Sequence, residues 1–150
     1  MLRFTDEQIA FQEVPNEVSL AFTIAGCTLG CKGCHSSYSW RANQGTPLTP
    51  VYLQHRLDSY KNLISCVLFL GGEWQPEALI SLLELSRHAG LNTCLYTGLD
   101  NVSSELKQQL TYLKTGCWLS ERGGLDSPHT NQIFTDLRSN TRLNHLFVKP

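Results

Sequence analysis

Short segments with the two-residue period of β-strands recur along the chain. Bulky and small side chains alternate through residues 19–25, so that the bulky ones share one face of a predicted strand. Residues 64–70 form a nearly unbroken apolar run, which is typical of a strand buried on both faces in a parallel sheet. The pattern predicts further short strands over residues 93–97, 115–119 and 144–148.

Amphipathic helices are predicted between these strands. Thr49 followed by Pro50 is a typical helix start, as is Pro76, and Gly90 is a typical helix end. A third helix is predicted over residues 103–113. In each helix, apolar residues recur at helical spacing: Leu53, Leu57 and Tyr60, then Leu79, Leu82 and Leu83, then Leu106, Leu110 and Leu113.

The alternation of strands and helices predicts an α/β fold with a parallel sheet. We expect a single domain over residues 1–150. A closed eight-unit barrel needs about 250 residues, so we expect an open, partial (βα) barrel of about five parallel strands. Functional sites in such sheets lie at the carboxyl ends of the strands. Two segments with candidate chemistry follow predicted strands there, residues 27–34 and 71–73.

Composition narrows the function classes. Twelve Lys and Arg residues against thirteen Asp and Glu residues argue against binding to nucleic acid or an anionic membrane. No apolar segment is long enough to span a bilayer, and residues 1–10 lack a signal-peptide pattern, so we expect a cytoplasmic protein. In that reducing compartment, clustered cysteines bind metal more often than they form disulfides. Three of the six cysteines lie within residues 27–34.

These three cysteines, Cys27, Cys31 and Cys34, have the spacing C-x3-C-x2-C in a glycine-rich loop. Three thiolates can hold three irons of a 4Fe–4S cubane and leave the fourth iron open to a substrate or cofactor. A structural zinc site, with His35 as fourth ligand, is the first alternative. The zinc site is disfavoured because Cys34 and His35 are adjacent in the sequence, and two adjacent side chains cannot easily point at one ion. Plain burial is disfavoured by the glycines and polar neighbours of the loop.

At these cysteines the sequence resembles the radical S-adenosylmethionine superfamily, whose hallmark is this spacing followed by an aromatic residue or histidine. The resemblance implies a barrel of the radical S-adenosylmethionine type. It also implies that the open iron binds S-adenosylmethionine and that the reduced cluster cleaves it to a 5′-deoxyadenosyl radical, which abstracts a hydrogen atom. His35 would lie near the adenine, although a lone histidine is more often an ordinary surface or core residue.

Gly71, Gly72 and Glu73 resemble the GGE motif of the same superfamily. Taken alone, they fit a strand-to-helix turn with an acidic residue near the helix N-terminus. The resemblance implies that the turn lies against the cofactor. Glu73 would then pair with the ammonium group of S-adenosylmethionine by a charge-assisted hydrogen bond.

A longer, collinear series resembles the activating proteins of anaerobic, class III ribonucleoside-triphosphate reductases. It extends from about Phe11 to Gln132 and includes residues 11–15, 17–20, 96–98, 121–125 and 130–132. The resemblance implies a glycyl-radical activase that takes hydrogen from a glycine of the large reductase subunit, with a reduced flavodoxin or ferredoxin as electron donor. Residues 121–122 and 130–132 carry no assignable mechanism, and Asn131 is equally well interpreted as a helix cap.

Two other functions remain open. One is a radical enzyme that acts on a small molecule, such as a compact deazapurine synthase, and needs no protein partner. The other is a non-catalytic electron-transfer protein, in which Cys66 or Cys117 supplies a fourth cluster ligand. Against that second function, we expect Cys66, Cys94 and Cys117 to be small buried residues of the predicted strands.

Overall fold

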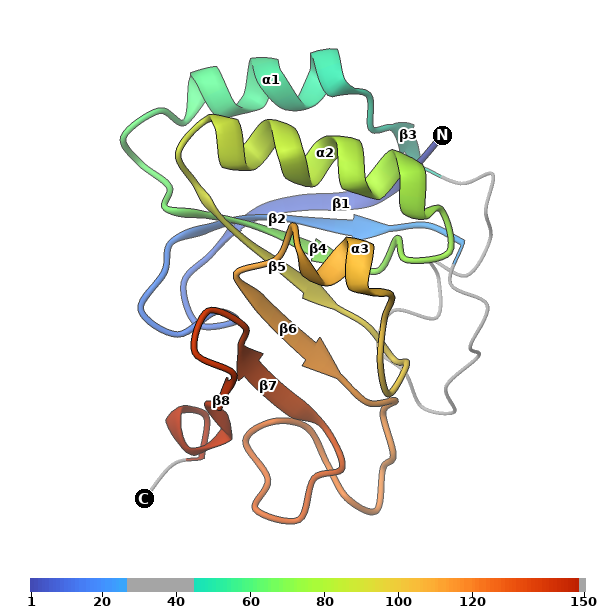
Figure 1. Cartoon of the computed structure of the whole chain (residues 1–150), viewed down its shortest axis with the longest axis vertical. Coiled ribbons are helices and arrows are strands. Elements are labelled where there is room, and N and C mark those ends of the chain that lie inside the picture. Colours follow the sequence, from blue (N-terminus) through green and yellow to red (C-terminus); the bar gives the residue numbers. More distant parts are fainter. Residues whose placement is uncertain (27–44, 149–150) are drawn as a thin grey trace.

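A mixed eight-stranded sheet forms the centre of the molecule (Figure 1). The computed structural model describes residues 1–26 and 45–148. In chain order the strands are β1 (Arg3–Ala10), β2 (Ser19–Ile24), β3 (Thr46–Pro47), β4 (Cys66–Leu70), β5 (Asn92–Tyr96), β6 (Tyr112–Thr115), β7 (Ile133–Asp136) and β8 (Thr141–Arg142). Their order across the sheet is β3-β1-β2-β4-β5-β6-β7-β8.

The α/β class is confirmed, but the described part of the sheet has four parallel strands rather than about five. They are β2, β4, β5 and β6, and antiparallel strands flank them on both sides. A further parallel neighbour needs a crossover connection, usually a helix. Residues 117–132, which join β6 to β7, contain no helix, so the chain returns directly and β7 runs antiparallel.

The helices α1 (Pro50–Ser59) and α2 (Pro76–His88) lie side by side on one face of the sheet (Figure 1). Both begin where the sequence predicts. Thr49 caps α1, since its hydroxyl oxygen accepts a hydrogen bond of 3.0 Å from the Tyr52 amide.

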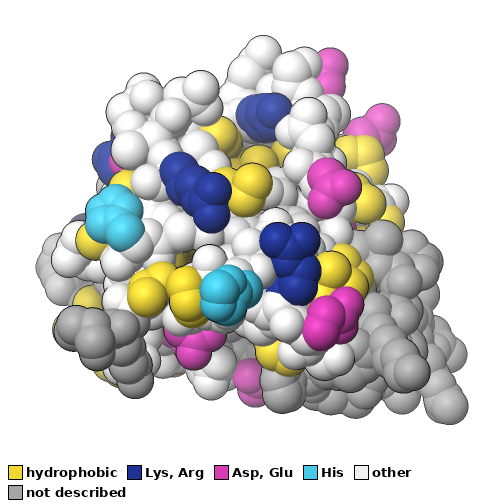
Figure 2. Space-filling model, turned by 90° about the horizontal axis from the view of Figure 1, so that it is seen from below, with side chains coloured by type: hydrophobic (Ala, Val, Ile, Leu, Met, Phe, Trp, Pro, Cys, Tyr) yellow, Lys and Arg dark blue, Asp and Glu magenta, His cyan; other side chains and the backbone are white. Residues whose placement is uncertain are grey.

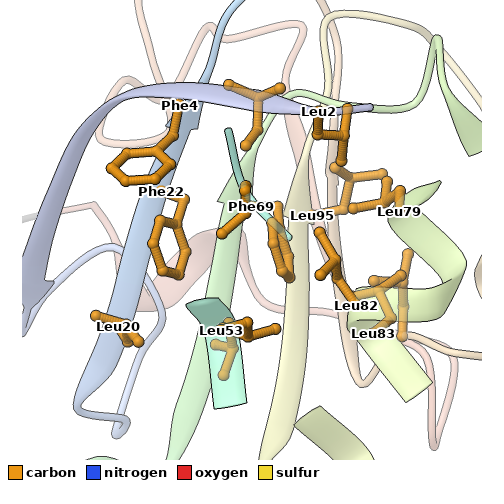
Figure 3. Close-up of a cluster of buried hydrophobic side chains, with 14 of the residues drawn as sticks. Leu2, Phe4, Leu20, Phe22, Leu53, Phe69, Leu79, Leu82, Leu83 and Leu95 are labelled. Carbon is orange, nitrogen blue, oxygen red and sulfur yellow. The ribbon is translucent and has the colours of Figure 1, made fainter. Parts of the chain in front are cut away.

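Two apolar clusters cover the two faces of the sheet. The larger lies under the helices, and Figure 3 shows its bulky members: Leu2, Phe4, Leu20, Phe22, Leu53, Phe69, Leu79, Leu82, Leu83 and Leu95. Burial of each such side chain contributes roughly 1.5–3 kcal/mol to the free energy of unfolding. The smaller cluster lies on the opposite face and consists of Ala10, Val14, Ala21, Cys66, Leu68, Cys94, Tyr112, Leu125 and Phe134. Here the loop that joins β1 to β2 folds across the sheet, and the Tyr96 hydroxyl donates to the Glu13 carbonyl.

Three predicted elements are wrong in extent or type. The helix predicted over residues 103–113 is the short α3 (Ser104–Lys107), because the following residues are drawn toward β5. The Thr111 amide donates to the Thr93 carbonyl (2.9 Å), and the Thr93 hydroxyl donates to the Gln109 carbonyl (2.6 Å). The strand predicted over residues 115–119 therefore lies earlier, as β6.

The last predicted strand, residues 144–148, is a short 3-10 helix, Asn144–Leu146. Asn144 is buried, and its side chain replaces strand pairing. Its oxygen accepts from the Phe134 amide (2.8 Å) and its nitrogen donates to the Gln132 carbonyl (2.8 Å). These bonds hold the C-terminal segment against β7.

Candidate cofactor site at the carboxyl edge of the sheet

The carboxyl ends of the four parallel strands meet at one edge of the sheet (Figure 1). β2 leads there into Gly26, β4 into Gly71, β5 into Thr97 and β6 into Gly116. The predicted ligands Cys27, Cys31 and Cys34, and the neighbouring His35, lie in residues 27–44, outside the described residues. That segment begins directly after Gly26, so its start lies at this edge.

Gly71 and Gly72 form the turn between β4 and α2, as the sequence predicts. Both have positive φ angles, of 100° and 111°, which glycine adopts without strain. A Cβ atom on Gly71 would lie 2.7 Å from Cη2 of Trp74, so a side chain there would displace the indole ring. The Gly71 amide donates to the Tyr96 carbonyl (3.0 Å), which fixes the turn to the end of β5.

Glu73 follows this turn and has one oxygen paired and one unpaired. The Thr97 hydroxyl donates to Oε1 of Glu73 over 2.7 Å. Oε2 is buried and has no hydrogen-bond partner among the described residues. A buried carboxylate oxygen without a donor is costly, so this atom is suited to accept a hydrogen bond from a ligand that carries an ammonium or N–H group.

Thr97 is a site residue to which the sequence assigned no role. It is 2% exposed, and its hydroxyl oxygen also accepts from the Leu99 amide (3.1 Å). The signals in the sequence were its position at the end of the strand predicted over residues 93–97 and its place in the resemblance segment 96–98. The hydroxyl orients the Glu73 carboxylate and leaves the second carboxylate oxygen for another donor.

Lys114, to which no pattern in the sequence pointed, places a positive charge at the same edge. Its ammonium donates to the carbonyls of Gly116 (2.9 Å) and Thr97 (3.3 Å) and lies 5.7 Å from the centre of the Tyr96 ring. The side chain is 9% exposed. The carboxyl edge therefore combines the half-buried Glu73 carboxylate with the buried Lys114 ammonium.

Asn131 does not cap a helix, because it precedes strand β7. Its side-chain nitrogen donates to the Cys117 carbonyl (3.0 Å), and its buried Oδ1 has no partner within the described ranges. The Thr130 hydroxyl donates to the Gly123 carbonyl (2.9 Å) and its oxygen accepts from the Gln132 amide (3.0 Å). The predicted segment 130–132 thus fixes the loop between β6 and β7 beside this edge.

The scattered cysteines divide between the two ends of the sheet. Cys66 and Cys94 are fully buried, as predicted, and burial raises the pKa of the Cys66 thiol to about 12. Cys66 pairs with Ser19, at the start of β2, roughly 20 Å along the strand from Gly26. It is therefore too distant to be a fourth ligand of a cluster that begins there. Cys117 lies outside the strands, after β6 and at the carboxyl edge, contrary to the prediction.

Two further features are absent from residues 1–26 and 45–148, a membrane-spanning helix and a cluster of metal-binding side chains. No helix in the described ranges has the length and apolar character needed to cross a bilayer. No group of three His, Cys, Asp or Glu side chains within them has the arrangement of a metal site. Figure 2 shows the end of the molecule that lies lowest in Figure 1, where charged side chains of both signs lie interspersed with hydrophobic ones.

Comparisons with known proteins bear on the segment that starts at this edge. Residues 17–117 match the family described as 4Fe-4S single cluster domain. The chain is also similar to the pyruvate formate-lyase-activating enzyme of Clostridium pasteurianum, with 36% identity over 78 residues, 48% of this chain and 33% of that enzyme. It thus matches about a third of the length of this relative. Because the family match includes the three clustered cysteines and covers 101 of 150 residues, the chain belongs to the family of 4Fe–4S single-cluster domains.

Proposed function

We propose that this protein is a radical S-adenosylmethionine enzyme that generates a glycyl radical on a protein partner. In this proposal Cys27, Cys31 and Cys34 hold the 4Fe–4S cluster and leave one iron open to S-adenosylmethionine. When bound, these two groups supply the one-electron chemistry that removes a hydrogen atom from a glycine. Membership of the 4Fe–4S family supports the cluster part of the proposal.

The unpaired oxygen of Glu73 is the observation that carries the cofactor part. Among the described residues, this buried carboxylate oxygen lacks a donor, and it lies at the edge where the cysteine segment begins. The ammonium of S-adenosylmethionine would satisfy it, while Thr97 holds the carboxylate in place. The backbone of Gly71 and Gly72 lets the ligand approach closely, and we assign His35 to the neighbourhood of the adenine.

The protein target that we propose is the large subunit of an anaerobic, class III ribonucleoside-triphosphate reductase. The relative from Clostridium pasteurianum is named as an activating enzyme, which supports a glycyl-radical target. The collinear resemblance over residues 11–132 supports the reductase as that target, with reduced flavodoxin or ferredoxin as the electron donor.

One experiment tests chemistry and target together. The protein is reconstituted anaerobically, reduced and mixed with S-adenosylmethionine and the reductase subunit. The expected result is a glycyl-radical doublet in electron paramagnetic resonance. A cluster that cleaves S-adenosylmethionine without this doublet supports the small-molecule enzyme instead. A cluster with no affinity for S-adenosylmethionine supports the electron-transfer protein.

The cluster ligands are tested separately. Reconstitution is expected to give about four irons per chain, the content of one cubane. Cys31→Ala is expected to abolish both iron binding and cleavage, because it removes one of only three protein ligands. Cys94→Ala is the matched control, because Cys94 is buried in β5, and it is expected to retain both. Equal behaviour of the two variants, or a stable protein with one zinc, contradicts the assignment.

A further inference from the structure

Strand β1 lies between the two ends of the cysteine segment, residues 27–44. β2, which leads into the segment, is its neighbour on one side, and β3, which follows the segment, is its neighbour on the other. Neighbouring strands lie about 4.8 Å apart, so the two ends of the segment are held about 10 Å apart across β1.

Backbone hydrogen bonds tie both ends to the first residues of β1. On the β2 side, the Ala25 amide donates to the Arg3 carbonyl over 2.8 Å. On the β3 side, the Leu48 amide donates to the Leu2 carbonyl, also over 2.8 Å. Leu2 and Arg3 therefore hold the chain on both sides of the cysteine segment, where it leaves β2 and where it continues past β3.

The Arg3 side chain adds a contact at the exit. Its Nη2 donates to the Gly45 carbonyl over 3.1 Å, and its Nε is buried. Gly45 has a φ angle of 88°, and a Cβ atom there would lie 2.2 Å from the Phe4 carbonyl oxygen. Only glycine permits this close approach to β1.

We propose that residues 2–4 form a clasp that fixes both ends of the cysteine segment, and that Arg3 is a positioning residue for cluster binding. The inference rests on the cluster of the proposed function but not on its target. Closing a loop of this length costs conformational entropy. Contacts that already hold its two ends in place reduce the entropy cost that cluster binding must offset. Arg3 lies outside the 17–117 match, so the family comparison does not assign it this role.

The first test compares two arginine variants by the rate at which a chelator removes the cluster. Arg3→Met removes the donor to Gly45 and is expected to shorten the cluster lifetime about tenfold, which corresponds to about 1.4 kcal/mol. Arg87→Met is the control. It removes another arginine hydrogen bond, the 2.7 Å bond from Arg87 in the last turn of α2 to the Gln109 side chain. Arg3→Lys keeps a cationic donor and is expected to recover most of the lifetime. Both methionine variants are expected to lower Tm of the apoprotein similarly.

The second test compares two glycines with positive φ angles. Gly45→Ala forces a shift against the Phe4 carbonyl, whereas a Cβ atom on Gly90 meets nothing within 4 Å. The backbone strain is similar in the two variants, but only Gly45→Ala is expected to shorten the cluster lifetime and to alter the paramagnetic resonance spectrum of the reduced cluster.

The clasp is overturned if neither Arg3→Met nor Gly45→Ala shortens the lifetime more than its control does. That result differs from a failure of the proposed function. Wild-type protein that assembles no four-iron cluster contradicts the function itself, whereas a stable wild-type cluster with unaffected variants contradicts only the clasp.

Discussion

The two ends of the parallel strands differ in how their polar side chains are partnered. At the amino end, Oε2 of Glu17 accepts hydrogen bonds from Asn92 (2.7 Å) and Tyr112 (2.8 Å), and Arg138 pairs with Asp136 (2.9 Å). Arg138 also donates to the Tyr112 hydroxyl over 3.1 Å, which joins the two pairs into one network. This network joins the amino ends of β5 and β6 to the carboxyl end of the antiparallel β7.

At the carboxyl end, in the described part of the chain, two buried acceptors have no partner, Oε2 of Glu73 and Oδ1 of Asn131. An unpaired buried acceptor costs about 1–3 kcal/mol. The amino end is not free of unpaired atoms, since the buried Ser19 hydroxyl has no partner in the described chain. Its charged side chains are nevertheless paired, whereas the Glu73 carboxylate at the carboxyl end keeps one oxygen unpaired. The network at the amino end ties neighbouring strands together, and the unpaired Glu73 oxygen at the carboxyl end is the atom that the proposed ligand would satisfy.

The largest expected effect is at the carboxyl end. Glu73→Gln keeps an acceptor for Thr97 but removes the negative charge, so cleavage of S-adenosylmethionine is expected to fall about 100-fold. The measurement is the 5′-deoxyadenosine formed per cluster under reducing conditions. Tm and iron content are expected to stay close to those of the wild type. If Glu73→Gln cleaves S-adenosylmethionine at the wild-type rate, the proposed contact with Glu73 is wrong.

The complementary change is at the amino end. Glu17→Ala leaves two donors unpaired and is expected to lower the free energy of unfolding by about 2–3 kcal/mol, measured by urea denaturation. Cleavage per folded molecule should not change. Glu13→Ala is the control, because Glu13 lies in the same loop. Among the described residues, its side chain accepts only a 3.3 Å bond from the neighbouring Gln12 amide. If the two variants have equal free energies of unfolding, the structural role assigned to Glu17 is wrong.

Alkaline pH should weaken the amino end through Cys66. Burial raises the pKa of this thiol from 9.0 to about 12, so the unfolded chain loses the proton first as pH rises. Stability is then lost from about pH 9 upward, and the free energy of unfolding should fall by roughly 1.4 kcal/mol between pH 8 and pH 10. Cys66→Ala should remove that part of the slope in urea titrations. An unchanged slope in the variant contradicts the raised pKa.

The smallest expected effect concerns Cys117 at the carboxyl edge. If three thiolates are enough to hold the cluster, Cys117→Ser should keep the iron content of the wild type, measured by colorimetric iron assay after reconstitution. Cys66→Ala, at the opposite end of the sheet, is the matched control. Loss of iron in Cys117→Ser alone would identify a fourth ligand and favour the electron-transfer function.

Local signals in the sequence were sufficient for the central units of the fold. Thr49 with Pro50, and Pro76, marked the true starts of α1 and α2, because capping and fixed φ angles act within one helical turn. The apolar run after residue 64 and the glycines at residues 71–72 placed β4 and its turn correctly. The location of the candidate site followed from these elements.

Contacts between distant residues explain what the sequence did not reveal. β1 has no counterpart among the predicted elements, because its charged residues obscure the alternation and its pairing partners, β2 and β3, lie further along the chain. The helix at residues 104–107 is short because Thr93 competes for residues 109–111. Thr97 meets Glu73 across 24 positions, a contact that no local pattern indicates.

The borders of the sheet have a consequence for any protein partner. β3 and β8 contain two residues each, and β3 pairs with β1 only at Arg3 and Phe4. Beyond Phe4, β1 has no β3 residue paired with it and carries Asp6 and Glu7. The register of its pairing with β2 also shifts between Phe4 and Asp6. Short, charged and irregular borders discourage the addition of a foreign strand. Docking of another polypeptide by main-chain pairing is therefore disfavoured, and recognition falls to loops and side chains.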